Sequence, residues 1–266
     1  MSEVPRLVLA GHVTRDEVAG GVRLGGPPSY CGLAAARLGV PAAIVTVAPP
    51  GEPLLQPLRD VPGLDLHVAP AAVMTTFALR HEGGARALSL KARARSLAPA
   101  DVPAALREAP VAFVGPVAAE CDRAFLASLR ARFVGVGLQG WLRTAEADGR
   151  VVPALAPEAL DPPPVDAAVV SEHDHPDVEA IARRFVERGA TVAITRGAAG
   201  ATVLWRGERA DVPASPATEV DSTGAGDVFA LVFTLRLAAG DPPQVAARAA
   251  ARAAARVVEG PGIGRL

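Results

Sequence analysis

One stretch of ten residues, 221–230, decides the fold: Asp221-Ser222-Thr223-Gly224-Ala225-Gly226-Asp227-Val228-Phe229-Ala230. From residue 228 to residue 239 apolar residues dominate without Pro or Gly, and Gly240 then interrupts the run. The pattern predicts a turn that leads directly into a helix over 228–239. Because the N–H groups of such a turn converge at the positive end of the helix dipole, the stretch predicts an anion-binding site.

Asp227 is the unusual member of this turn, because a carboxylate repels a bound anion. One interpretation is an N-terminal helix cap, which stabilises a helix by about 1 kcal/mol. The other is a base beside a phosphoryl group, which takes the proton from an attacking hydroxyl. An isolated Gly-x-Gly-Asp favours the cap, so more of the chain has to be considered.

Composition narrows the class of protein. The 266 residues are half hydrophobic and carry a net charge of -1, so they provide a sizeable core and no basic surface for nucleic acid or anionic membrane. The two cysteines, Cys31 and Cys121, form no CxxC pair and are expected to be buried thiols in a reducing compartment. No signal sequence or apolar run of membrane-spanning length is present, which predicts a cytoplasmic protein without a membrane partner.

Apolar runs alternate with helical stretches along the chain. The predicted strands cover residues 6–11, 42–47, 111–114, 134–138, 165–170 and 190–195, and two hairpins are expected at 73–90 and 201–212. Helices are expected up to about residue 38 and over 123–133 and 244–258. This alternation predicts an α/β fold with a doubly wound, mostly parallel sheet, whose ligands lie beyond the carboxyl ends of the strands.

The stretch 221–230 resembles the signature of the ribokinase-like (PfkB) family of sugar kinases, D-T/S-T-G-A-G-D-x-F, at every characteristic position. The resemblance implies that Gly224, Ala225 and Gly226 form an anion hole, with Asp227 as the catalytic base. It also implies that Thr223 binds the donor and that a monovalent cation binds near Asp221.

Two segments near the N-terminus extend the resemblance. Residues 11–16 resemble the G-x-x-x-x-D start of the family, in which the Asp, here Asp16, bonds substrate hydroxyls. Gly25 and Gly26 resemble its G-G-x-x-x-N motif and allow a ligand to approach the backbone. Tyr30 stands where many sugar kinases have Asn, so ribose or fructose specificity does not transfer directly.

The family also covers its substrate with a small β lid. The corresponding segments here are about residues 12–25 and 71–92, inserted in a single kinase domain that spans 1–266. Both segments are short. A compact lid indicates either a small substrate or a lid completed by the partner subunit of a homodimer.

Residues 138–143, Leu-Gln-Gly-Trp-Leu-Arg, resemble the V-Q-G-F-x-R segment of a subgroup that contains myo-inositol 3-kinases. Gln139 would then contact substrate hydroxyls, and Arg143 the substrate or the transferred phosphate. Equally, Trp141 is explained as a core residue and Arg143 as a surface cation.

The remaining matches concern ATP and magnesium. Thr195, Gly197 and Gly200 resemble the T-x-G-x-x-G nucleotide loop, and Gly262 follows the helix that borders the adenine pocket in the family. Ser171-x-x-Asp174 stands where the family has N-x-x-E, which organises magnesium through water, so the resemblance implies a magnesium site at Asp174 with a carboxylate one methylene shorter. The neighbouring His173 and His175 lack the spacing of a zinc site.

Together these motifs predict an ATP-dependent kinase that phosphorylates a hydroxyl of a small polyhydroxylated substrate, with myo-inositol as the first choice. A furanose sugar or a nucleoside is the alternative acceptor, and a non-catalytic sugar-binding protein on the same fold is the alternative role. An oxidoreductase is disfavoured, since residues 224–226 lack the third glycine and the acidic partner of a dinucleotide site.

Overall fold

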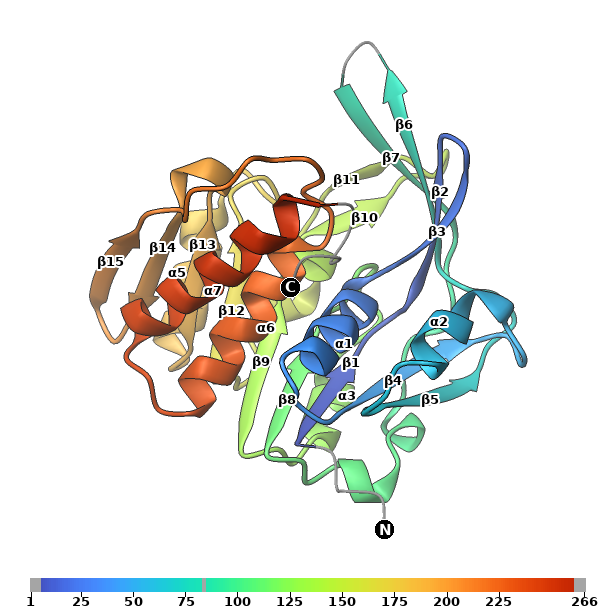
Figure 1. Ribbon diagram of the computed structural model, residues 1–266, viewed down its shortest axis with the longest axis horizontal. Coiled ribbons are helices and arrows are strands. Elements are labelled where there is room, and N and C mark those ends of the chain that lie inside the picture. Colours follow the sequence, from blue (N-terminus) through green and yellow to red (C-terminus); the bar gives the residue numbers. More distant parts are fainter. Residues whose placement is uncertain (1–5, 83–84, 261–266) are drawn as a thin grey trace.

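The computed structural model describes residues 6–82 and 85–260. Within these ranges, nine strands form one sheet in the order β15-β14-β13-β12-β9-β8-β1-β4-β5 (Figure 1). These strands are β1 (Leu7–Ala10), β4 (Ala42–Ala48), β5 (Leu64–Pro70), β8 (Val111–Val114), β9 (Phe133–Gly137), β12 (Ala167–Ser171), β13 (Thr191–Thr195), β14 (Ala201–Trp205) and β15 (Glu208–Val212). Neighbours from β13 to β5 pair in parallel, whereas β14 and β15 are antiparallel. The prediction of a mostly parallel sheet is confirmed.

Helices cover both faces of this sheet. One face carries α1 (Pro27–Arg37), α2 (Gln56–Arg59), α6 (Ala225–Ala238) and α7 (Pro243–Val258), and the other carries α3 (Arg123–Ser128), α4 (Pro157–Leu160) and α5 (Val178–Glu187). Because successive strand residues point to opposite faces, Leu7 and Leu9 enter one core while Val8 and Ala10 enter the other. The sheet is therefore doubly wound.

Helix α6 is the helix that positions the residues of the 221–230 stretch. Every residue from Val228 to Thr234 is buried, and a Cβ at Gly135 of β9 would lie 2.3 Å from the Thr234 hydroxyl. Only a glycine allows the helix to approach the strand this closely. Helix α6 is thus packed closely against the sheet.

A second sheet, which we call the small sheet, contains β2 (Thr14–Val18), β3 (Gly21–Gly25), β6 (Thr76–Glu82) and β7 (Ala85–Ala92) in the order β3-β2-β6-β7. It projects from the side of the main body (Figure 1). A short hairpin, β10 (Arg143–Ala145) with β11 (Val151–Pro153), lies next to β7.

Some predicted boundaries were wrong. The helix expected over 123–133 ends at Ser128, since Leu129 is extended and Phe133 already pairs with Val111 as the first residue of β9. The hairpin expected from residue 73 begins at Thr76. Strand β5, helix α5 and the β10–β11 hairpin were not anticipated.

Both cysteines are buried, as expected. No helix among the described residues has the length and apolar character needed to cross a membrane.

Candidate active site

The turn before α6 has the conformation that an anion site requires. Gly224 adopts a left-handed conformation with φ 83° at the N-cap, and Asp221 shapes the loop by accepting a 2.9 Å hydrogen bond from the Thr223 N–H. Within the described chain, the N–H groups of Gly226 and Asp227 donate to no acceptor. Two donors therefore remain available at the positive end of the α6 dipole.

Asp227 follows directly in the first turn of α6. Burial raises the pKa of its carboxyl to about 7, the charge of Arg143 opposes this shift, and Asp174 and Asp16 reinforce it. These electrostatic interactions indicate that the acids Asp227, Asp174 and Asp16 and the cation Arg143 lie close together, although they come from four different segments. An acid with a pKa near neutrality is suited to accept a proton during turnover.

Asp16 lies on β2 and accepts a 2.8 Å hydrogen bond from the Thr14 hydroxyl. Gly25 and Gly26 pass so close to Asp16 and His12 that neither position has room for a side chain. A Cβ on Gly25 would lie 2.1 Å from the Asp16 carboxylate, and one on Gly26 would lie 2.2 Å from the His12 carbonyl oxygen. In this structure the two glycines therefore leave room for the Asp16 carboxylate and the His12 carbonyl oxygen, and this packing holds Asp16 near the carboxyl end of β1.

Gln139, Arg143 and Asp174 form the opposite wall. Asp174 accepts from the Gln139 amide at 3.2 Å and from the Ser171 N–H at 2.8 Å, and burial raises the pKa of its carboxyl. Arg143 donates from Nε to the Val117 carbonyl oxygen at 2.8 Å and lies over the ring of Phe77 at 5.0 Å from its centroid.

Residues 138–143 had two interpretations, as a substrate-binding segment or as a core residue followed by a surface cation, and each holds for a different residue. Trp141 is fully buried, donates to the Cys121 carbonyl oxygen and stacks with Phe185, so it is a core residue. Arg143, in contrast, is not a surface cation, because burial lowers the pKa of its guanidinium while the charges of Asp174, Glu120, Asp227 and Asp16 counteract the shift.

Tyr30 connects the two sides of the site. Its ring lies against Gly224, where a Cβ would be 2.6 Å from the Tyr30 Cδ1 atom. Burial raises the pKa of the Tyr30 hydroxyl, and the nearby Asp16 and Asp227 charges raise it further. The phenol therefore stays neutral and fills the space between the turn and the Asp16 wall.

The predicted nucleotide loop follows β13. Thr195 ends the strand, and Gly197 and Gly200 have positive φ values of 50° and 94°. No hydrogen bond or ion pair among the described residues joins this loop to residues 221–227. Gly262 lies outside the described residues.

The structure offers no preformed cluster of metal ligands: in the described ranges no group of three or more His, Cys, Asp or Glu side chains is arranged to hold a metal ion. His173 is exposed beside Glu172, and His175 accepts from the Asp177 N–H.

Arg23 and Phe77 are residues of this region that the sequence motifs did not indicate. Arg23 lies on β3 directly across from Asp16, and its NH1 atom is 3.7 Å from the Asp221 carboxylate. The Gly20-Gly21 turn, which predicts a tight hairpin after Asp16, is the signal that could have placed Arg23 next to that acid.

Comparisons with known proteins find one family match and several solved structures of the same fold. Residues 166–265 match the model of the pfkB family carbohydrate kinases. A pyrophosphate-dependent kinase in the ribokinase family, solved with a pyrophosphate analog and myo-inositol, superposes with a TM-score of 0.81 at 20% identity, covering 96% of each chain. No curated protein matches significantly.

Two further structures share the fold. A ribokinase from Arabidopsis thaliana, complexed with ribose and ATP, gives a TM-score of 0.73 at 18% identity and covers 99% of this chain and 96% of its own. A ribokinase-type structure from E. coli with ATP and Mg²⁺ gives 0.72 at 19% identity, covering 97% and 94%.

Proposed function

We propose that the chain is a carbohydrate kinase of the ribokinase-like pfkB family, whose model residues 166–265 match, and that it transfers the γ-phosphoryl group of ATP to one hydroxyl of a small cyclitol, with myo-inositol as the first choice. The observation that carries the proposal is the position of Asp227. Its carboxyl, with a pKa of about 7, directly follows two available N–H groups at the start of α6.

The reaction needs a base, an acceptor held in line and stabilisation of the charge on the phosphoryl group. Asp227 takes the proton from the attacking hydroxyl as the new O–P bond forms and the bond to ADP breaks. The N–H groups of the 224–227 turn stabilise the charge on the transferred group. Asp16 and Gln139 orient the acceptor, and the positive charge of Arg143 favours the charged form of Asp227 and Asp174.

Asp174 is the carboxylate that would hold magnesium, because Mg²⁺ commonly takes one or two carboxylates and completes its shell with phosphate oxygens and water. When bound, it would neutralise charge on the donor phosphates. Asp221 already faces the Arg23 guanidinium, so we assign no step to a monovalent cation there.

Three features support a cyclitol acceptor. Gln139 and Arg143 lie together on one wall of the site, Tyr30 replaces the amide of typical sugar kinases, and strands β2 and β3 of the small sheet have only five residues each. A similar structure was solved with myo-inositol. A furanose sugar or a nucleoside is the alternative acceptor, and a sugar-binding role without catalysis is the alternative function.

Pyrophosphate is a second candidate donor, favoured by the higher TM-score to the pyrophosphate-dependent kinase than to the ATP-bound structures. Its bond cleavage requires the same base and the same anion hole. The two donors differ only in the need for an adenine pocket.

The test is product formation on a panel of cyclitols, pentoses, hexoses and nucleosides, with Mg²⁺-ATP and with Mg²⁺-pyrophosphate as donors. We expect selective turnover of one cyclitol with one donor. Preferred turnover of a furanose or nucleoside would replace the acceptor, and binding of acceptors without turnover by either donor would support the sugar-binding role.

The pH profile provides an independent test. Since Asp227 must be deprotonated to act as a base, kcat/KM is expected to rise with pH through about 7 and then level off. In Arg143→Gln the loss of the opposing positive charge is expected to move this midpoint to higher pH. A midpoint near 4, the ordinary range of Asp, would contradict the assignment of Asp227.

A further inference from the structure

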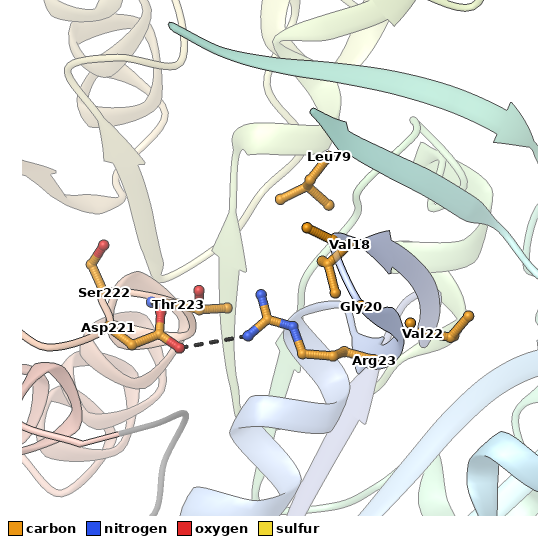
Figure 2. A pocket seen from close by; sticks show the side chains of 10 residues that line it. Val18, Gly20, Val22, Arg23, Leu79, Asp221, Ser222 and Thr223 are labelled. Carbon is orange, nitrogen blue, oxygen red and sulfur yellow. Dashed lines mark hydrogen bonds and ion pairs between the residues drawn. The ribbon is translucent and has the colours of Figure 1, made fainter. Parts of the chain in front are cut away.

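A cavity of ≈ 560 Å³ lies between the small sheet and the turn before α6. It is lined by residues 18–23, by Leu79 and by residues 221–223, as Figure 2 shows. Among the described residues that line it, Arg23 is the one cation. The cavity thus brings together a guanidinium, two hydroxyl side chains and the loop that leads to the anion-binding N–H groups.

The Arg23 guanidinium points toward Asp221 across this cavity (Figure 2). Their closest atoms are 3.7 Å apart, and the Arg23 side chain is 52% exposed. A pair at this distance lacks a hydrogen bond, and an ion pair with a half-exposed guanidinium contributes little to stability. A ligand with more negative charge can therefore take the guanidinium from Asp221 at little cost.

The position of Arg23 connects it to the reaction. Arg23 is directly opposite Asp16 in the antiparallel β2–β3 pair, so both side chains lie on the same face of the hairpin. Arg23, Asp16, Asp221 and Asp227 all act electrostatically on the Tyr30 hydroxyl. The cation therefore lies within reach of the group of acids that surrounds the transfer site.

We propose that Arg23 is a donor-binding residue that the small sheet supplies: a phosphate group of the donor replaces Asp221 as the partner of the guanidinium. A planar guanidinium offers two parallel N–H donors to phosphate oxygens, which makes it a stronger partner for phosphate than for a carboxylate at 3.7 Å. This inference rests on the proposed kinase function and adds that donor binding draws the β2–β3 hairpin to residues 221–223.

The test measures binding of inorganic pyrophosphate and of a non-hydrolysable ATP analogue to the full chain by calorimetry, without an acceptor. Arg23→Gln is expected to weaken binding about 10-fold or more, as for loss of a charge-assisted hydrogen bond, and Arg23→Lys to recover part of it. Arg15→Gln is the matched control. It removes the same charge from the same hairpin, on the opposite face, and is expected to bind normally.

A loss confined to pyrophosphate, or to the nucleotide analogue, supports the proposal and identifies the donor. Equal binding by Arg23→Gln and the unaltered protein overturns it, as does the absence of binding of both ligands to the unaltered protein. Thermal unfolding checks that each variant is folded. Because no turnover is involved, failure of this inference is distinct from failure of the proposed function, which is decided on the acceptor panel.

Discussion

Asp227→Asn is expected to lower kcat by about 10²- to 10⁴-fold, the usual contribution of a general base. The amide keeps the size of the side chain and cannot accept the proton of the attacking hydroxyl. The KM of the acceptor is expected to change little, since Asp16 and Gln139 orient it. The measurement is steady-state product formation with the preferred acceptor and donor.

A stability measurement separates this effect from misfolding. Burial already raises the pKa of Asp227 to about 7, so a neutral amide at this position is expected to leave the thermal unfolding temperature unchanged or raise it. Asp65→Asn, an exposed acid on the edge strand β5, is the matched control and is expected to retain full activity. Undiminished transfer by Asp227→Asn would show that another group takes the proton.

Gly224→Ala is expected to cause the second large loss, about 10²- to 10³-fold in kcat, the usual cost of a displaced anion-hole donor. Two causes act together. The residue has φ 83°, a conformation that costs a non-glycine residue about 1–3 kcal/mol, and the added Cβ would lie 2.6 Å from the Tyr30 ring. The turn must shift, and its N–H groups move with it.

The double variant Gly224→Ala with Tyr30→Ala distinguishes the two causes. Removing the ring relieves the collision and leaves the backbone strain, so partial recovery of kcat relative to Gly224→Ala is expected. Gly240→Ala, another positive-φ glycine at the far end of α6 with open space around it, is the control for general destabilisation. If Gly224→Ala were as active as Gly240→Ala, the conformation of the turn would be unimportant for catalysis.

The strands were predictable wherever an apolar run ends at a glycine, proline or polar residue. Strands β1, β8 and β14 lie within a residue or so of their predicted positions because their buried side chains define them locally. The mostly exposed β15 also lies at its predicted residues, as the second strand of the hairpin with β14. The segment after Ser128 was not predictable in this way. Its apolar spacing fits a helix, but pairing of Phe133 with Val111, a contact distant in sequence, extends the chain instead.

The candidate site shows the same difference between what local sequence patterns predict and what depends on contacts distant in sequence. Asp16, Gln139 and Asp174 each follow the carboxyl end of a main-sheet strand, so parallel topology alone predicts that they gather at one edge. Arg23 depends on how the β2–β3 hairpin lies over residues 221–223, and the pKa of Asp227 depends on burial by several segments. Neither is encoded in a local pattern.

The burial of α6 separates what must stay constant in this protein from what is free to change. The proposed base and N–H donors belong to a helix whose residues 228–234 are all buried, whereas β2 and β3 supply no member of either buried core cluster. Substitutions at the exposed positions of the hairpin are therefore expected to alter the choice of ligand at little cost in folding free energy, while the proposed chemistry of transfer is tied to a buried helix. Such a division allows one scaffold to acquire new acceptors by gradual change.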